Sequence, residues 1–363
     1  MGMDVDLDSV TMRFGDFTAV QKANLTVKSG EFFSFLGPSG CGKTTILRMV
    51  SGFIDPTEGS IRIGDQDMRG IGPNKRPTAL IFQNLALFPL MKVWENIAFG
   101  LRFRNVDAAA RRKRAEELLD LIELTGQGEK LVSELSGGQR QRVAVARALA
   151  VEPEVLLLDE PLSALDLKLR QHMRAELRAI QRRTGVTFIY ITHDQGEALT
   201  MSDRVAVMSQ GVIEQIDDAE VIYNRPNTAF VATFVGENNP FYGRVAETSS
   251  DGHAIVETDL GRIRGVNAGR RVVGDNVIVF VRPERCEIAN GKDYDNVLET
   301  TIDRLDFEGA FVNLFLKGPR RKDIVVHMPN DGRAIEYQAG APAKMGFSAE
   351  NATVLPEGEL SKE

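Results

Sequence analysis

Two glycine-rich segments of this chain could bind phosphate, and they lie far apart in the sequence. Residues 37–44 read Gly-Pro-Ser-Gly-Cys-Gly-Lys-Thr, and residues 135–139 read Leu-Ser-Gly-Gly-Gln. Glycines let the backbone turn tightly and point its N–H groups at phosphate oxygens. Because only the first of these segments contains a lysine, the second can complete a phosphate site but cannot easily form one alone. This asymmetry predicts that two chains share two bound nucleotides.

The first segment lies between a predicted strand and a predicted helix. The apolar run at residues 31–36 indicates a buried parallel strand, and a helical pattern begins at Thr44. In that context the segment is a P-loop, in which Lys43 bridges the β- and γ-phosphates and the Thr44 hydroxyl ligates Mg²⁺. The alternative is a glycine turn with a solvated lysine, and the flanking strand and helix argue against it. The residues expected to bind ATP here are Gly37, Pro38, Ser39, Gly40, Cys41, Gly42, Lys43, Thr44 and Thr45.

An acidic pair follows a second buried strand. The aliphatic run at residues 155–158 ends in Asp159, Glu160 and Pro161. Open α/β sheets place their ligands at the carboxyl ends of such strands. We expect Asp159 to be a partner of Mg²⁺ and Glu160 to polarise a water for in-line attack on the γ-phosphate. In the alternative interpretation, Glu160 only caps a helix that begins near Pro161.

With these motifs in place, the chain resembles the nucleotide-binding subunit of ABC transporters. Phe14 occupies the position where that family stacks an aromatic ring on adenine, and Gln83 matches the glutamine that contacts Mg²⁺ and senses the membrane partner. Residues 163–166, which include Asp166, match the family's D-loop, and His193 matches its switch histidine. Alone, Phe14 would more often be a core aromatic residue and His193 a structural histidine. Together, in this order and spacing, the motifs indicate the family.

The second glycine-rich segment matches the family's signature sequence. It precedes a predicted helix at residues 139–150, so its hydroxyl and N–H groups form an anion-binding helix start. If two chains meet head to tail, this helix start faces the γ-phosphate in the P-loop of the other chain. The resemblance therefore implies ATP binding in trans by Ser136, Gly137, Gly138, Gln139 and Asp166. The resemblance also assigns catalysis to Glu160, His193 and Gln83. It implies a Mg²⁺ site at Thr44, Gln83 and Asp159. Further ATP contacts are expected from Phe14, Gln83 and Asp159.

Composition limits the classes of protein that this chain can be. The 363 residues are 43% hydrophobic and 26% charged, which suits two to three compact domains. No apolar run is long enough to span a bilayer, and the start lacks an export signal. A net charge of −7 argues against nucleic-acid binding, and the basic cluster at residues 111–114 is interpreted as a solvated helix face. The two cysteines, Cys41 and Cys286, form no disulfide framework, and Cys41 is expected to be thiolate-prone near a helix N-terminus.

The pattern along the chain predicts an α/β P-loop NTPase core, the ABC ATPase, followed by a C-terminal all-β domain. Residues 1–239 form the core with an antiparallel edge, and the insert at about 91–150, which contains a predicted helix at 108–124, is a helical subdomain. Residues 240–363 are expected to form an OB-like domain that resembles the TOBE domain of importer ATPases. Its predicted strands include 276–281, 311–316 and 323–328. Dimerisation or regulation is favoured for this domain over simple bracing.

One further segment has two possible roles, and the remaining histidines predict no site. Residues 86–91 and Trp94 form an apolar stretch just after Gln83, which lines a groove for a permease helix or packs in the core. The histidines His172, His253 and His327 are too scattered in the sequence to predict a metal site, in contrast to the clustered spacing of metal ligands.

The resemblance implies an ATP-hydrolysing importer subunit that uses ATP and Mg²⁺. It would work as a homodimer at the cytoplasmic face of the inner membrane, as a peripheral protein. Its partners would be two transmembrane permease subunits and an extracytoplasmic solute-binding protein, with no nucleic acid. The run 37–91 and the C-terminal layout are most similar to polyamine (spermidine/putrescine) importers, with iron(III), sulfate, aminophosphonate or sugar as alternative solutes. A soluble ABC ATPase without a transport role is the alternative of another class, and a small-molecule kinase leaves the signature unexplained.

Overall fold

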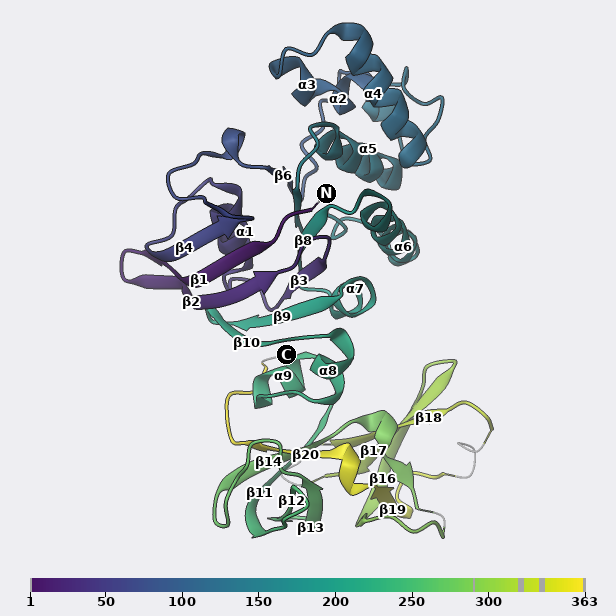
Figure 1. The fold of residues 1–363 in the computed structure, drawn as a ribbon. Helices are drawn as coiled ribbons and strands as arrows, with labels where there is room; N and C mark the ends of the chain where they lie inside the picture. Colours follow the sequence, from purple (N-terminus) through teal and green to yellow (C-terminus); the bar gives the residue numbers. More distant parts are fainter. Residues whose placement is uncertain (1, 290, 319–322, 333–336, 362–363) are drawn as a thin grey trace. The chain divides into compact units, whose positions relative to one another are not determined.

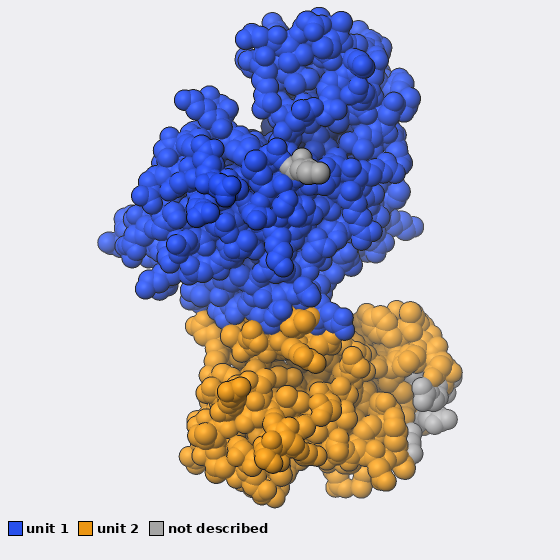
Figure 2. Space-filling model, in the orientation of Figure 1, with its two compact units in different colours: residues 1–220 blue, residues 221–363 orange. Residues whose placement is uncertain are grey.

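The computed structural model describes residues 2–289, 291–318, 323–332 and 337–361 (Figure 1). The chain divides into two compact units, residues 1–220 and 221–363, which are coloured separately in Figure 2. Within the described residues, no helix is long and apolar enough to cross a membrane.

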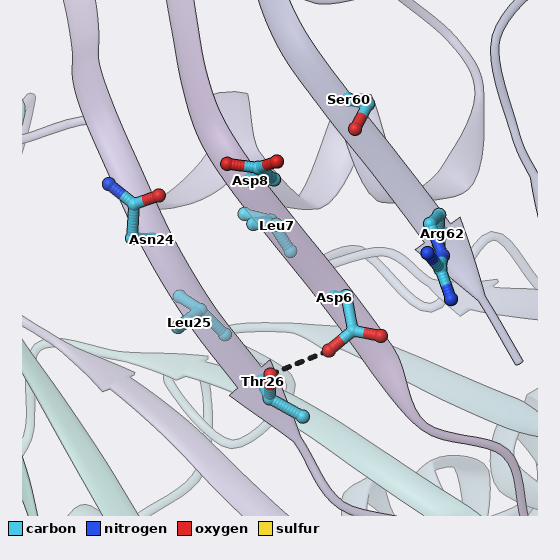
Figure 3. Close-up of a pocket in the computed structure, with 8 residues that line it drawn as sticks. All are labelled: Asp6, Leu7, Asp8, Asn24, Leu25, Thr26, Ser60 and Arg62. Atoms are coloured by element: carbon cyan, nitrogen blue, oxygen red, sulfur yellow. Dashed lines mark hydrogen bonds between the residues drawn. The ribbon is translucent and has the colours of Figure 1, made fainter.

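The first unit begins with an antiparallel sheet in the order β2-β1-β4-β5. Its strands are β1 (Val5–Phe14), β2 (Phe17–Val27), β4 (Glu58–Ile63) and β5 (Gln66–Asp67). On its polar face lies an open hollow, shown in Figure 3, where the Thr26 hydroxyl donates to Asp6 at 2.6 Å. None of the predicted site residues lines this hollow. The antiparallel pairing of β1 with β2 and with β4 confirms the predicted antiparallel edge of the core.

A second sheet of the first unit has the strand order β10-β9-β3-β8-β7-β6. Neighbours from β9 to β6 run parallel, and β9 and β10 form an antiparallel hairpin. The central strands β3, β8 and β7 are buried and predominantly apolar, as expected for a parallel sheet that is covered on both faces. The strands predicted at 31–36 and 155–158 are confirmed. The bounds are β3 (Phe32–Leu36), β6 (Thr78–Ile81), β7 (Val155–Asp159), β8 (Thr187–Thr192), β9 (Arg204–Ser209) and β10 (Val212–Asp217).

The helices of the first unit divide into a group around the parallel sheet and a separate group. The first group is α1 (Lys43–Ser51), α6 (Leu167–Thr184) and α7 (Gln195–Met201). The second is α2 (Val93–Ile97), α3 (Phe99–Phe103), α4 (Ala108–Leu121) and α5 (Gly137–Ala150), which lie together in Figure 1. Helix α5 begins two residues before the predicted start at 139. The reason is the capping box: the Ser136 hydroxyl accepts the Gln139 N–H at 3.3 Å and draws both signature glycines into the first turn.

The second unit is all-β apart from short helices, as predicted. A closed barrel has the order β11-β12-β13-β20-β14, and a separate five-stranded sheet has the order β15-β19-β16-β17-β18. The barrel closes because β20 returns from the end of the chain to pair with β14 and β13. The bounds are β11 (Asn239–Thr248), β12 (His253–Thr258), β13 (Gly261–Val266), β14 (Asn276–Val281) and β20 (Ala352–Pro356). The other sheet contains β15 (Glu287–Ile288), β16 (Asn296–Phe307), β17 (Phe311–Lys317), β18 (Asp323–Pro329) and β19 (Pro342–Phe347).

A buried arginine explains where the second unit begins. The Arg282 guanidinium donates to the carbonyls of Val235 and Tyr223, each at 2.6 Å, and lies 4.0 Å from the centre of the Tyr223 ring. Burial lowers the pKa of Arg282, and the guanidinium offsets the cost of burial by binding carbonyl oxygens. The segment with α9 (Ala229–Phe234) is thus tied to the barrel. The domain boundary expected at 239/240 stays a prediction.

Candidate active site

Parallel strands of the second sheet bring the predicted site residues to one edge. The P-loop follows β3, Glu160 follows β7, His193 follows β8 and Gln83 follows β6. These strands are neighbours in the order β3-β8-β7-β6, and all run in the same direction. The carboxyl ends of parallel strands meet at one edge of a sheet, which is where such folds bind ligands. Residues far apart in the sequence therefore lie around one site.

The P-loop requires glycine at defined positions. Gly40 and Gly42 have φ angles of 80° and 106°, in the region that residues with a side chain rarely adopt. A Cβ atom on Gly42 would lie 2.4 Å from the Ala19 carbonyl oxygen, and one on Gly37 would lie 2.4 Å from that of Met208. The glycines thus allow the loop to pack tightly against β2 and β9 while helix α1 begins directly after it. This arrangement points the start of α1 at the space above the loop.

Lys43 is folded over its own loop. Its ammonium group donates to the Gly37 carbonyl at 2.7 Å and to the Pro38 carbonyl at 2.9 Å, and the residue is only 5% exposed. A phosphate above the loop would compete with both carbonyls for the same ammonium group.

Cys41 differs from its predicted behaviour. The side chain is buried beneath the loop, with its Sγ 3.7 Å from the Lys43 ammonium group. Burial raises the pKa of the Cys41 thiol above its ordinary value, although the charge of Lys43 acts in the opposite direction. The prediction of a thiolate-prone Cys41 is therefore wrong. A helix start lowers a thiol pKa only where the sulfur stays accessible to water, and this sulfur does not.

Thr44 and Asp159 are the pair that fits a divalent cation. The Thr44 hydroxyl donates to Asp159 Oδ1 at 3.2 Å. Burial raises the pKa of Asp159, and the negative charge of Glu160 adds to this effect, while the bond from Thr44 opposes it. A hydroxyl and a carboxylate beside a phosphate loop suit Mg²⁺, which takes few protein oxygens and completes its shell with water and phosphate. In the described chain there is no group of three or more His, Cys, Asp or Glu side chains that could hold a metal.

Glu160 and His193 contact each other at the sheet edge. Glu160 Oε2 lies 3.0 Å from His193 Nδ1, and the Glu160 N–H donates to the Ile191 carbonyl at 3.1 Å. Glu160 has a φ of 46°, a strained value that active sites often contain. No helix begins at Pro161: residues 161–164 form a turn, and α6 begins at Leu167 with Asp166 as its cap. The interpretation of Glu160 as a helix cap is therefore wrong.

Gln83 is linked to Glu160 through a hydroxyl group. The Gln83 Nε2 atom donates to the Ser163 hydroxyl at 3.2 Å, and this hydroxyl donates to the Glu160 carbonyl at 2.9 Å. In the structure Gln83 is therefore bonded to the D-loop, and its role as a metal ligand stays a prediction. Sequence reasoning identified Ser163 only as part of a motif. Its position in the motif does not predict that the Ser163 hydroxyl binds Gln83 and the Glu160 carbonyl.

Arg147 is a residue that sequence reasoning missed. From helix α5 it donates to the carbonyls of Leu85 and Ala86, both at 2.6 Å. These two residues follow Gln83 and both have left-handed φ angles, 58° and 45°. Burial lowers the pKa of Arg147. In the sequence it looks like an ordinary basic residue in the last turn of a helix, so no local signal indicated this contact.

The signature residues lie on a separate, accessible helix start. Ser136 is exposed and its N–H donates to Gln139 Oε1 at 2.9 Å. Among the described residues, no hydrogen bond or ion pair joins residues 136–139 to the P-loop of the same chain. Asp166 is also exposed, and its carboxylate accepts the Leu169 N–H at 3.0 Å. Phe14, at the end of β1, is 51% exposed and free to stack on a ligand.

Fold and site together define a P-loop nucleoside triphosphatase. Residues 20–163 match the family model described as ABC transporter, and residues 279–355 match the TOBE domain model. The chain is 45% identical to a spermidine/putrescine import ATP-binding protein of Rubrobacter xylanophilus, over 97% of this chain and 93% of that protein. A protein of the same description from Thermobifida fusca is 44% identical, over 96% of this chain and 92% of that protein.

A solved structure supports the same assignment for the first unit. It is a dimeric ATP-binding cassette in a post-hydrolysis state bound to ADP and Pi. Its identity to this chain is 33% and the TM-score is 0.52, with 59% of this chain and 98% of that chain covered. The chain therefore belongs to the family of ABC importer ATPases. It is an ATP-binding, ATP-hydrolysing subunit with a C-terminal TOBE domain.

Proposed function

We propose that this ATPase drives the import of a polyamine, spermidine or putrescine. The observation that carries the proposal is the likeness to relatives described as spermidine/putrescine import ATP-binding proteins, which extends over 97% of this chain at 45% identity. The likeness spans both the ATPase region and the TOBE domain, so it is not limited to motifs that all ABC ATPases share.

The working unit in this proposal is a head-to-tail homodimer. Each P-loop holds one nucleotide, and the exposed helix start at Ser136 from the other chain encloses its γ-phosphate. Two features support this: the signature has no lysine, and Ser136, the cap residue at the start of α5, is exposed. The homodimer would sit beneath two permease subunits, at the cytoplasmic face of the membrane, and receive solute from an external binding protein.

Within each site, the residues divide the chemistry of hydrolysis. Phe14 stacks on adenine and Lys43 binds the phosphates. Thr44 and Asp159, with Gln83, would hold Mg²⁺. The bound cation supplies charge neutralisation on the phosphate oxygens. Glu160 accepts the proton of the attacking water on a carboxylate oxygen. His193 Nδ1, which lies 3.0 Å from Glu160 Oε2, fixes the position of that carboxylate relative to the γ-phosphate.

The permease is proposed to dock on exposed apolar side chains near Gln83. Leu90 is 90% exposed, and Phe53 and Phe82 are exposed with ring centres 6.3 Å apart. Two neighbours of Leu90 in the apolar stretch behave differently: Leu87 and Trp94 pack against the core. Core packing thus describes Leu87 and Trp94, while a groove for the permease stays our proposal for the exposed Leu90. The neighbouring Phe53 and Phe82 rings and the exposed Leu90 side chain are apolar surface that a permease segment could cover.

Leu90→Asp is expected to uncouple ATP hydrolysis from transport. A charge at this exposed position weakens an apolar contact with the permease, which we expect to lower solute uptake about tenfold or more. ATP affinity and the unfolding temperature should stay at the wild-type values, because Leu90 touches neither the site nor the core. Val212→Asp, at an exposed position on β10, is the control and should leave uptake unchanged. Loss of folding in Leu90→Asp would instead assign the residue to packing.

The test of the whole proposal uses the complete transporter in proteoliposomes with its binding protein. ATP hydrolysis is measured with and without spermidine, putrescine, iron(III), sulfate, an aminophosphonate or maltose. We expect stimulation by a polyamine and none in a complex that carries Glu160→Gln. Stimulation by another solute alone would keep the import role and refute the polyamine assignment. Hydrolysis by a chain that associates with no membrane subunit would refute the transport role.

A further inference from the structure

Arg170 lies in the first turns of helix α6 and reaches two loops of the site. Its Nη2 atom donates to the Leu165 carbonyl at 3.0 Å, at the end of the D-loop turn. Its Nη1 atom donates to Asp194 Oδ2 at 2.9 Å, directly after the switch histidine. A third partner is the buried carboxylate of Glu197, 3.8 Å from the Arg170 Nε atom. One guanidinium therefore joins two loops that are separate in the sequence.

Both neighbours of His193 are held by this group of residues. The Thr192 hydroxyl donates to Glu197 Oε2 at 2.6 Å, and the Asp194 N–H donates to the Thr192 hydroxyl at 2.9 Å. Asp194 also accepts the Glu197 N–H at 3.0 Å and so caps α7. His193 itself is exposed between these anchored residues. Its position is thus determined by where Asp194 and Thr192 are held.

The ion pair at Asp194 is charged at neutral pH. Burial alone would raise the pKa of Asp194, but the N–H of Glu197 and the guanidinium groups of Arg170 and Arg174 hold it below the ordinary value. Arg174 donates to Asp194 Oδ1 at 3.1 Å. It anchors the same carboxylate as Arg170, and it has no hydrogen bond to the D-loop among the described residues. Both arginines therefore hold Asp194, but of the two Arg170 alone also binds the D-loop turn.

We propose that Arg170 is a positioning residue that couples the D-loop to His193. Leu165 precedes Asp166, and in the proposed homodimer Asp166 contacts the nucleotide of the partner chain. A shift of the D-loop on engagement of that nucleotide moves the Leu165 carbonyl, and Arg170 transmits the shift to Asp194 and the adjoining histidine. Hydrolysis at one site then depends on occupation of the other. This coupling rests on the shared-nucleotide homodimer of the proposed function.

The variants that test this are Arg170→Met and the matched control Arg174→Met. Methionine keeps much of the apolar stem and removes the guanidinium, while the remaining arginine still binds Asp194 in each variant. ATP hydrolysis by the full-length chain is measured against ATP concentration. We expect a Hill coefficient above 1 in the wild type, because two sites are coupled. In Arg170→Met it should fall to about 1, and kcat should fall about ten- to a hundredfold through misplacement of His193.

Arg174→Met should keep the wild-type Hill coefficient. Equal loss of cooperativity in both variants, unchanged cooperativity in Arg170→Met, or a wild-type coefficient of 1 would each overturn the proposal. A second measurement tests the homodimer itself: Glu160→Gln, alone and combined with Arg170→Met, is passed over a sizing column with ATP. We expect a dimer in both. A Glu160→Gln chain that stays monomeric would refute the shared-nucleotide dimer and the coupling with it, whereas a dimer with unaltered cooperativity refutes only the role of Arg170.

Discussion

Glu160→Gln is expected to lower ATP hydrolysis by about 10²–10⁴-fold while ATP binding is retained. The amide has nearly the same shape as the carboxylate, but it cannot accept a proton from the attacking water. The contact with His193 Nδ1 at 3.0 Å can be kept by the amide oxygen, so the site should stay assembled. The measurement is the steady-state rate of phosphate release, together with the dissociation constant for ATP from calorimetry.

A matched control is Glu152→Gln. Its side chain is 75% exposed at the surface, where it pairs with Arg114 at 3.3 Å, so the same chemical change should leave the rate within the error of the wild type. Exposed ion pairs of this kind contribute little to stability. Hydrolysis by Glu160→Gln near the wild-type rate would remove Glu160 as the base. His193 would then be the next residue to test, since it is the side chain that Glu160 contacts.

Lys43→Ala is expected to weaken ATP binding by about 10- to 100-fold, which corresponds to losing a charge-assisted hydrogen bond of roughly 1.4–2.8 kcal/mol. In the structure the Lys43 ammonium group is bonded to the carbonyls of Gly37 and Pro38, at 2.7 and 2.9 Å. A phosphate oxygen would compete with these carbonyls for the same ammonium group. The loss of affinity is therefore the difference between two sets of bonds, and smaller than the strength of the phosphate contacts alone.

The measurement is equilibrium ATP binding to the full-length chain, with thermal unfolding recorded in parallel. Lys28→Ala, at an exposed position outside the site, is the control and should bind ATP as the wild type does. Lys43→Met provides a second variant that keeps part of the buried stem, in case the alanine variant unfolds. Unchanged affinity in a folded Lys43 variant would exclude this lysine from the phosphate site.

Local patterns predicted much of the first unit. Buried parallel strands are covered on both faces, so β3 and β7 appear in the sequence as predominantly apolar runs. Helix α5 begins two residues before the position that the local pattern predicts, because the reciprocal bonds of Ser136 and Gln139 extend the helix over residues with poor intrinsic helix propensity. In the second unit the strands expected at 276–281, 311–316 and 323–328 are confirmed as β14, β17 and β18, but local patterns do not predict that a barrel and a second sheet form separately. That separation depends on β20 pairing with β14, a contact between distant segments.

The sequence by itself determined the P-loop, the acidic strand end, the signature and the order of the short motifs, because their chemistry depends on residue types at fixed local spacing. Only the tertiary structure decided the partners of these residues. It buried the Cys41 thiol, placed His193 against Glu160 and bonded Gln83 to the D-loop. It also joined the D-loop to Asp194, the residue after His193, through Arg170. The physical reason is that hydrogen bonds and desolvation depend on distances between side chains from different strands and helices, which local spacing does not contain.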